Sequence, residues 1–117
     1  MPKIGTDIIE ISRIAKNMEN PKFIARIFDE EELLSLGSPL LAESLAARFA
    51  AKEAVIKALG EAVPFKDIAV IRQKSGAPLL ILKNEALAKA NKLNLINWEI
   101  SLSHSREYAV AMVFATE

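Results

Sequence analysis

Three separated points in the sequence carry side chains that could do chemistry. Asp7 lies near the end of an apolar N-terminal segment, Glu53 and Lys57 lie in an alanine-rich segment, and His104 lies near the end of an apolar C-terminal segment. Carboxylates bind divalent cations and a lysine binds phosphate as a point charge. The sequence has no glycine-rich phosphate loop of the standard kinds. Spacing alone does not bring the three points together.

Each of these residues also has a structural interpretation. Asp7 could form a turn or cap at a strand end, or a metal or phosphate site beside Gly5, whose missing side chain permits close backbone approach. Glu53 and Lys57 could form an i,i+4 ion pair worth about 0.2–0.5 kcal/mol. His104 alternates in phase with apolar residues and could be a histidine at the edge of the core. The residues alone leave these alternatives open.

Composition narrows the kinds of partner and metal. The 117 residues fit one domain, residues 1–117, and 51% of them are hydrophobic, as in a folded globular protein. Fifteen basic and fifteen acidic residues cancel, which disfavours a nucleic-acid binder. The single histidine, His104, excludes the usual multi-histidine zinc sites, so oxygen ligands and Mg²⁺, Mn²⁺ or Ca²⁺ are favoured.

We expect the protein to be cytoplasmic and not to associate with a membrane. The absence of cysteine is compatible with a reducing compartment. The N-terminus lacks a signal-peptide pattern, and no apolar run approaches the roughly 20 residues of a membrane span.

Hydrophobic periodicity predicts the elements that must position these residues. Alternation predicts strands, and helices are indicated by apolar stripes, a Ser12 cap, the Asn20-Pro21 break and glycine stops at Gly37 and Gly60. The predicted strands cover about 3–9, 68–72, 78–82, 98–104 and 108–114, and the predicted helices about 13–19, 29–36, 38–59 and 84–92. This order predicts an α+β fold with a mostly antiparallel sheet, a long central helix and shorter helices packed on it.

The long helix carries more charge than its apolar surroundings explain. At about 100° per residue, Lys52 projects into the middle of an arc of bulky apolar side chains and Arg48 falls at its edge. Charges are rarely buried without partners. The helix therefore either borders a partly open polar cleft, or its charges reach water along their apolar stems.

Three segments together resemble a known family. They are Gly-Thr-Asp-Ile-Ile-Glu-Ile-Ser-Arg-Ile at 5–14, Arg-Phe-Ala-Ala-Lys-Glu-Ala at 48–54, and Ile-Ser-Leu-Ser-His-Ser-Arg-Glu-Tyr-Ala at 100–109. Their order and intervals resemble the signature segments of holo-acyl-carrier-protein synthases, the small bacterial 4′-phosphopantetheinyl transferases. Residues 23–33 also resemble the family, so the similarity covers nearly the whole chain. Each segment alone is weak, but the three together are specific.

The resemblance implies an enzyme that transfers the phosphopantetheine arm of coenzyme A to a serine of an apo acyl carrier protein, in support of fatty acid biosynthesis. It implies Asp7 and Glu53 as Mg²⁺ ligands and, with His104, as catalytic residues. Mg²⁺ typically uses one or two carboxylates together with substrate phosphates. The general base stays open among Glu53, a water on the metal and His104, with the first two favoured.

The resemblance also implies residues that bind coenzyme A. Lys57 would contact phosphate, Arg48 the 3′-phosphate side, and His104 the nucleotide phosphates, with Gly76 in a neighbouring loop. That loop is usually Gly-Lys-Pro or Gly-Arg-Pro in the family, whereas here an alanine, Ala77, replaces the basic residue.

Members of the family form trimers with coenzyme A bound between neighbouring subunits, and the resemblance implies the same assembly for this chain. The apolar C-terminal strands suit such an interface. The resemblance implies that the carrier protein docks near Arg13, although the stretch after it is less basic than is common. The alternative is a non-catalytic nucleotide- or carrier-protein-binding domain of the same fold. The presence of Asp7, Glu53 and Lys57 favours the enzyme.

Overall fold

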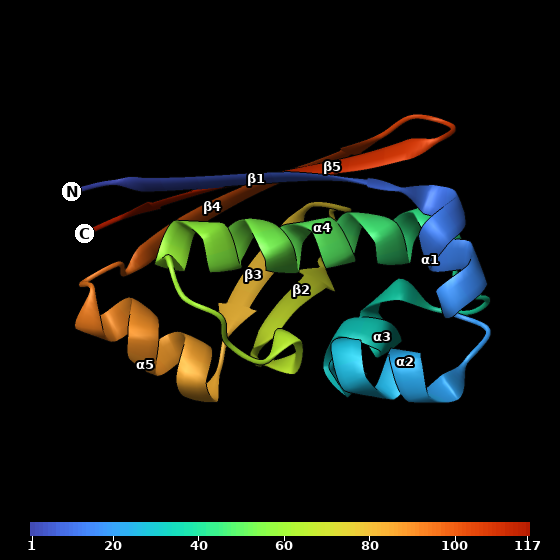
Figure 1. The fold of residues 1–117 in the computed structure, drawn as a ribbon, viewed down its shortest axis with the longest axis horizontal. Coiled ribbons are helices and arrows are strands. Elements are labelled where there is room, and N and C mark those ends of the chain that lie inside the picture. The colour runs from blue at the N-terminus through green and yellow to red at the C-terminus, as the bar shows by residue number, and fades with distance from the viewer.

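The computed structural model describes residues 1–117, and they form one strand, four helices, a hairpin, a fifth helix and two further strands (Figure 1). The strands are β1 (Lys3–Glu10), β2 (Ile68–Arg72), β3 (Pro78–Leu82), β4 (Asn97–His104) and β5 (Tyr108–Thr116). The helices are α1 (Ile11–Asn17), α2 (Pro21–Ile27), α3 (Glu30–Leu36), α4 (Ala42–Leu59) and α5 (Asn84–Lys92), and a 3₁₀ turn spans Phe65–Asp67. The α+β class predicted from the sequence is confirmed.

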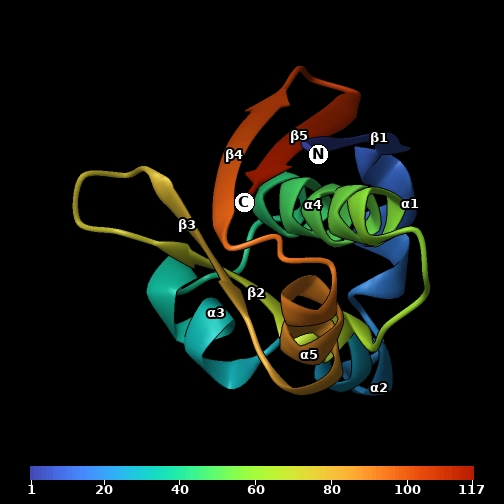
Figure 2. The ribbon, with the colours of Figure 1, turned by 90° about the vertical axis from the view of Figure 1, so that its left-hand side faces the viewer.

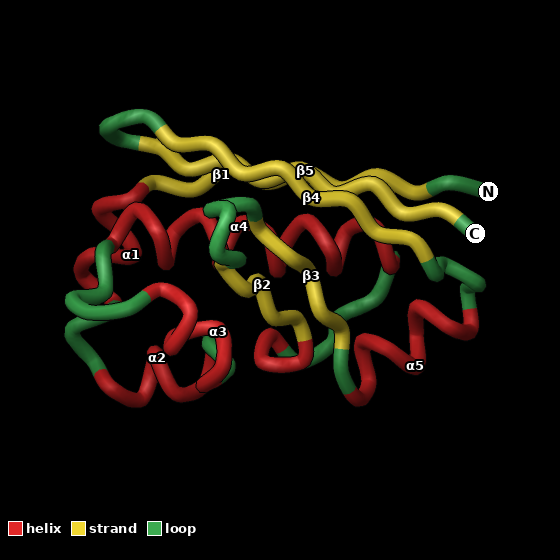
Figure 3. Tube along the Cα trace, turned by 180° about the vertical axis from the view of Figure 1, so that it is seen from behind, coloured by secondary structure: helices red, strands yellow, loops and turns green.

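Five strands form two antiparallel groups. The strand order in the larger sheet is β1-β5-β4, and β2 pairs with β3 in a separate hairpin. The larger sheet lies along one side of α4, and the hairpin crosses this helix at a steep angle (Figure 3). The register pairs Asp7 with Ala111 and Ala111 with Leu102, so these three side chains share the face that covers α4.

Helix α4 is central because its small side chains let other elements approach it. Ala46, Ala50 and Ala54 are fully buried. A Cβ atom added to Gly5 would lie 1.9 Å from the carbonyl oxygen of Ala54, so only glycine allows β1 this close to the helix. Asp7 follows two residues later on the same face of β1 and is therefore held against α4. No helix combines the length and apolar character needed to cross a membrane.

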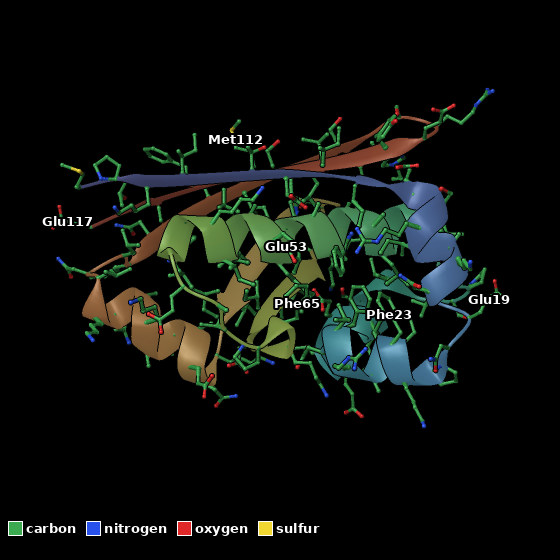
Figure 4. All side chains as sticks on the ribbon, viewed as in Figure 1. Glu19, Phe23, Glu53, Phe65, Met112 and Glu117 are labelled. Atoms are coloured by element: carbon green, nitrogen blue, oxygen red, sulfur yellow. The ribbon has the colours of Figure 1, made fainter.

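The opposite face of the sheet carries exposed apolar side chains. Ile4 and Ile8 are 62% and 61% exposed, and Met112 and Phe114 are 48% and 44% exposed. Ile4 pairs directly with Phe114 across the strands. Figure 4 shows Met112 on this face, away from α4. An exposed apolar patch of this kind is typical of a surface that contacts another protein chain.

Lys52 forms a buried ion pair. Its side chain is fully buried, and Nζ lies 2.8 Å from Oε1 of the equally buried Glu32 of α3. Nζ also donates hydrogen bonds to the carbonyl oxygens of Phe65 and Ile68, and the N–H of Val70 donates to Oε2 of Glu32 at 2.7 Å. The expectation that this charge borders a cleft or reaches water is wrong, because a carboxylate 20 residues earlier in the chain neutralises it.

Two predicted helix starts are wrong. Ser12 does not cap α1, because the helix already begins at Ile11 and the extended Glu10 occupies the cap position without a side-chain hydrogen bond. The N–H of Ile11 donates to the carbonyl oxygen of Glu107 at 2.8 Å instead. The long helix begins at Ala42 and not near residue 38, because Leu41 is extended and its carbonyl accepts the first helical hydrogen bonds. The predicted stop is confirmed, since Gly60 ends α4 in a left-handed conformation at φ 75°.

The sequence pattern does not predict helix α2. The Asn20-Pro21 pair indicates a break there, but in the structure it also starts a helix. The side chain of Asn20 accepts a hydrogen bond from the N–H of Lys22 at 2.9 Å, and Pro21 occupies the first helical turn. Both positions suit these residue types.

Candidate active site

A carboxylate and a lysine meet where β1 lies on α4. Oδ1 of Asp7 is 3.1 Å from Nζ of Lys57, which also donates to the carbonyl oxygen of Thr6 at 2.9 Å. The Asp7 side chain is 19% exposed and that of Lys57 is 55% exposed, so the pair opens to the surface. Lys57 thus pairs with Asp7 and not with Glu53, the partner that helical spacing suggested.

Glu53 lies beside this pair on α4. It is half-buried, and its carboxylate has neither a hydrogen-bond partner nor an ion-pair partner. Burial and the negative charge of Asp7 raise the pKa of Glu53, and the positive charges of Lys57 and Arg13 oppose this rise. Two neighbouring carboxylates, one of them unpaired, repel each other, so a cation bound between them would stabilise the ionised form of both.

These two carboxylates fit a hard divalent cation. Asp7 and Glu53 supply only oxygen donors, and no group of three or more acidic, histidine or cysteine side chains is arranged so that it could hold a metal ion by itself. Mg²⁺ usually takes one or two carboxylates and completes its shell with waters and substrate phosphates. The donor set therefore suits Mg²⁺ shared with a phosphate ligand better than a site made of protein groups alone.

Arg48, His104 and Gly76 line a second region. With Arg72 and other residues they surround a cavity of about 220 Å³. Arg48 is 5% exposed and its Nη1 donates to the carbonyl oxygen of Ser44 at 3.2 Å, whereas His104 is exposed at the end of β4. Arg72 was not predicted as a site residue. The only sequence signal was its position at the end of β2, in phase with the apolar Ile68 and Val70.

The two regions lie on different sides of α4. Arg48 and Glu53 are five positions apart on the helix, which separates their directions by about 140°. Figure 2 looks along α4 and shows β1 and α1 on one side of it, with β4 and the β2–β3 hairpin on the other. The cavity lining includes neither Asp7 nor Lys57. The structure thus brings Asp7, Glu53 and Lys57 together within one chain but does not bring His104 to them.

An aromatic cluster extends from the carboxylates toward α2. Phe49, one turn before Glu53, lies 5.3 Å from Phe65 and 6.3 Å from Phe23 between ring centroids. The guanidinium of Arg13 lies 6.0 Å from the centre of the Phe49 ring. In Figure 4, Phe65 and Phe23 lie below Glu53, on the side of α4 away from the sheet. The carboxylate site is therefore bordered by a partly apolar surface that carries one arginine from α1.

Comparisons with known proteins cover nearly the whole chain. The sequence model of the 4′-phosphopantetheinyl transferase superfamily matches residues 3–113 of this chain. The holo-[acyl-carrier-protein] synthases of Alkaliphilus metalliredigens and Dehalococcoides mccartyi are 46% and 49% identical, each with 97% of both chains covered. A solved holo-(acyl-carrier-protein) synthase from Bacillus anthracis, in complex with coenzyme A (3′,5′-ADP), is 41% identical with a TM-score of 0.78, covering 97% of this chain and 94% of that one. The chain belongs to the 4′-phosphopantetheinyl transferase superfamily.

Proposed function

We propose that the protein, with residues 1–117 acting as one catalytic domain, is a holo-[acyl-carrier-protein] synthase. It transfers the 4′-phosphopantetheine arm of coenzyme A to a serine of an apo acyl carrier protein and releases adenosine 3′,5′-bisphosphate. Family membership and the names of the relatives support this activity. The observation that carries it in the structure is the pair of carboxylates Asp7 and Glu53 beside Lys57, because a pyrophosphate donor needs a cation site and a positive side chain together.

Asp7 and Glu53 would hold Mg²⁺, which would supply Lewis-acid stabilisation of the phosphate charge when bound. The serine oxygen forms a bond to the β-phosphorus of coenzyme A, and the bond from that phosphorus to the bridging oxygen of the pyrophosphate breaks. Lys57 binds a phosphate oxygen as a point charge. The serine proton moves to an oxygen of Glu53, the carboxylate of the pair that has no ion-pair partner.

We infer that coenzyme A spans two copies of the chain. Asp7, Glu53 and Lys57 form one half of the site, and Arg48, His104 and Gly76 form the other half on a different side of α4. A neighbouring copy that presents its Arg48 half to the Glu53 half completes the site. The exposed apolar face of the sheet, which includes Ile4 and Met112, supports a homotrimer built through this face.

The carrier protein docks beside Arg13. Arg13 is exposed on α1 and lies over Phe49, one turn from Glu53. An acidic helix that pairs with Arg13 would bring its serine near the carboxylates. The synthase would serve fatty acid biosynthesis in the cytoplasm, as the resemblance implies.

Mass spectrometry of an apo carrier protein tests the proposed function. Incubation with the protein, coenzyme A and Mg²⁺ should add the mass of phosphopantetheine to the serine of the carrier. Glu53→Ala and Asp7→Ala should each nearly abolish the addition with the far-ultraviolet circular dichroism unchanged. Absence of the addition with several carriers would favour a non-catalytic binding domain, and full activity in both variants would refute the metal site.

A further inference from the structure

The cavity beside α4 holds more positive than negative charge. Arg48 and Arg72 line it together with His104, and the two arginines lie close enough that the charge of Arg72 acts on Arg48. None of the ion pairs in the structure includes either arginine. Glu43 also lines the cavity, but it forms no ion pair with them. The cavity therefore has two permanent positive charges that no protein group within ion-pair distance neutralises.

Arg48 also has an unused hydrogen-bond donor. Its side chain is 5% exposed, and its Nε is buried with no partner. Burial, and then the positive charge of Arg72, lower the pKa of Arg48. A buried, unpaired donor on a cation is costly unless a ligand satisfies it. The arrangement suits an anion that enters the cavity and contacts both guanidinium groups.

The β2–β3 hairpin fixes the position of Arg72. Its N–H donates to Oγ of Ser35 at 2.9 Å, and it pairs with Pro78 on β3. The hairpin offers one other cation, Lys74, which lies in the turn and does not line the cavity. Ala77 carries no charge, so Arg72 is the cation that the hairpin brings to this site.

We propose that Arg72 is a specificity-determining residue that binds, together with Arg48, the phosphomonoester of coenzyme A. This inference rests on the proposed function and deepens it. A phosphomonoester carries nearly two negative charges at neutral pH, which matches two guanidinium groups, whereas each pyrophosphate phosphorus carries about one. Coenzyme A has one phosphomonoester, on its ribose, and 3′-dephospho-coenzyme A lacks it.

Titration calorimetry with coenzyme A and 3′-dephospho-coenzyme A, in Mg²⁺, tests the proposal. Arg72→Ala should weaken coenzyme A binding by at least about tenfold and 3′-dephospho-coenzyme A binding by less than about twofold, since one charge-assisted contact to the phosphomonoester is lost. Arg72→Lys should recover part of the loss. The matched control Lys74→Ala should change both affinities by less than about twofold.

The exposed side chain of Arg72 can be replaced without opening the core, and the circular dichroism of each variant checks this. Equal losses for the two ligands, or no loss for either, would overturn the role of Arg72. If the unmodified protein still transfers the arm in that case, the proposed function stands and only this inference fails. If the unmodified protein binds neither ligand, both fail.

Discussion

Breaking the buried ion pair between Lys52 and Glu32 should strongly destabilise the fold. Lys52→Met keeps an unbranched apolar side chain but removes the ammonium group, and leaves the fully buried carboxylate of Glu32 without its counter-charge. It also removes a donor from the carbonyl oxygens of Phe65 and Ile68. Removing one partner of such a pair costs about 3–5 kcal/mol.

This loss is large, but it is smaller than the total free energy of unfolding expected for the domain. A domain of this length typically has a free energy of unfolding of about 6–17 kcal/mol. The Lys52→Met variant should therefore still fold, with a melting temperature lower by roughly 10–20 °C. Because α4 also carries Glu53, unfolding of the variant removes the proposed site, so its activity should fall steeply near the new melting temperature.

Urea unfolding followed by the fluorescence of Trp98, the single tryptophan, measures the effect. All variants are compared at one protein concentration, because the proposed assembly would contribute to the apparent stability. Glu32→Gln alone should also lower the free energy of unfolding. The double variant should lose at least about 1 kcal/mol less of this free energy than the two single variants lose in sum. Additive costs, or a cost below about 1 kcal/mol for Lys52→Met, would refute the assignment of a coupled buried pair.

Three further predictions use the contact of β1 with α4 and the outer face of the sheet. Gly5→Ala should lower the free energy of unfolding, measured by urea titration, by about 1–3 kcal/mol or more, because the new Cβ would collide with the carbonyl oxygen of Ala54. Burial and the charge of Asp7 raise the pKa of Glu53, so its ionised form destabilises the fold above that pKa. Glu53→Gln should accordingly raise the stability of the metal-free protein at neutral pH, and the gain should vanish below the ordinary range of glutamate pKa. A loss of stability at neutral pH would contradict this sign. Met112→Asp should shift the protein to smaller species in analytical ultracentrifugation and reduce transfer, whereas an unchanged assembly would contradict a subunit contact through the sheet.

Local patterns predicted most of the elements but not the contacts between them. Alternation at 98–104 and the glycine stop after Leu59 suffice for β4 and for the end of α4. Periodicity also placed Lys52 in an apolar arc. It could not name Glu32 as the partner, since α3 begins with three successive glutamates and only the fold decides which one turns inward.

The candidate site shows the same limit. The sequence offered Asp7, Glu53, Lys57 and His104 as separate points, and the resemblance assigned them to one reaction. The close contact at Gly5 explains why Asp7 meets Lys57. The position of His104 at the far edge of the sheet, on β4, follows from the strand order β1-β5-β4, which no local pattern specifies.

The most direct test of the central claim is complementation between two inactive variants. Glu53→Ala disables one half of the proposed site and His104→Ala disables the other. Each variant alone should transfer almost no phosphopantetheine. If neighbouring copies complete each other's sites, co-expression in equal amounts should give mixed trimers in which about a quarter of the sites are intact. Recovery of about a quarter of the activity is the predicted result, and mixed assemblies as inactive as the separate variants would contradict a site shared between two copies.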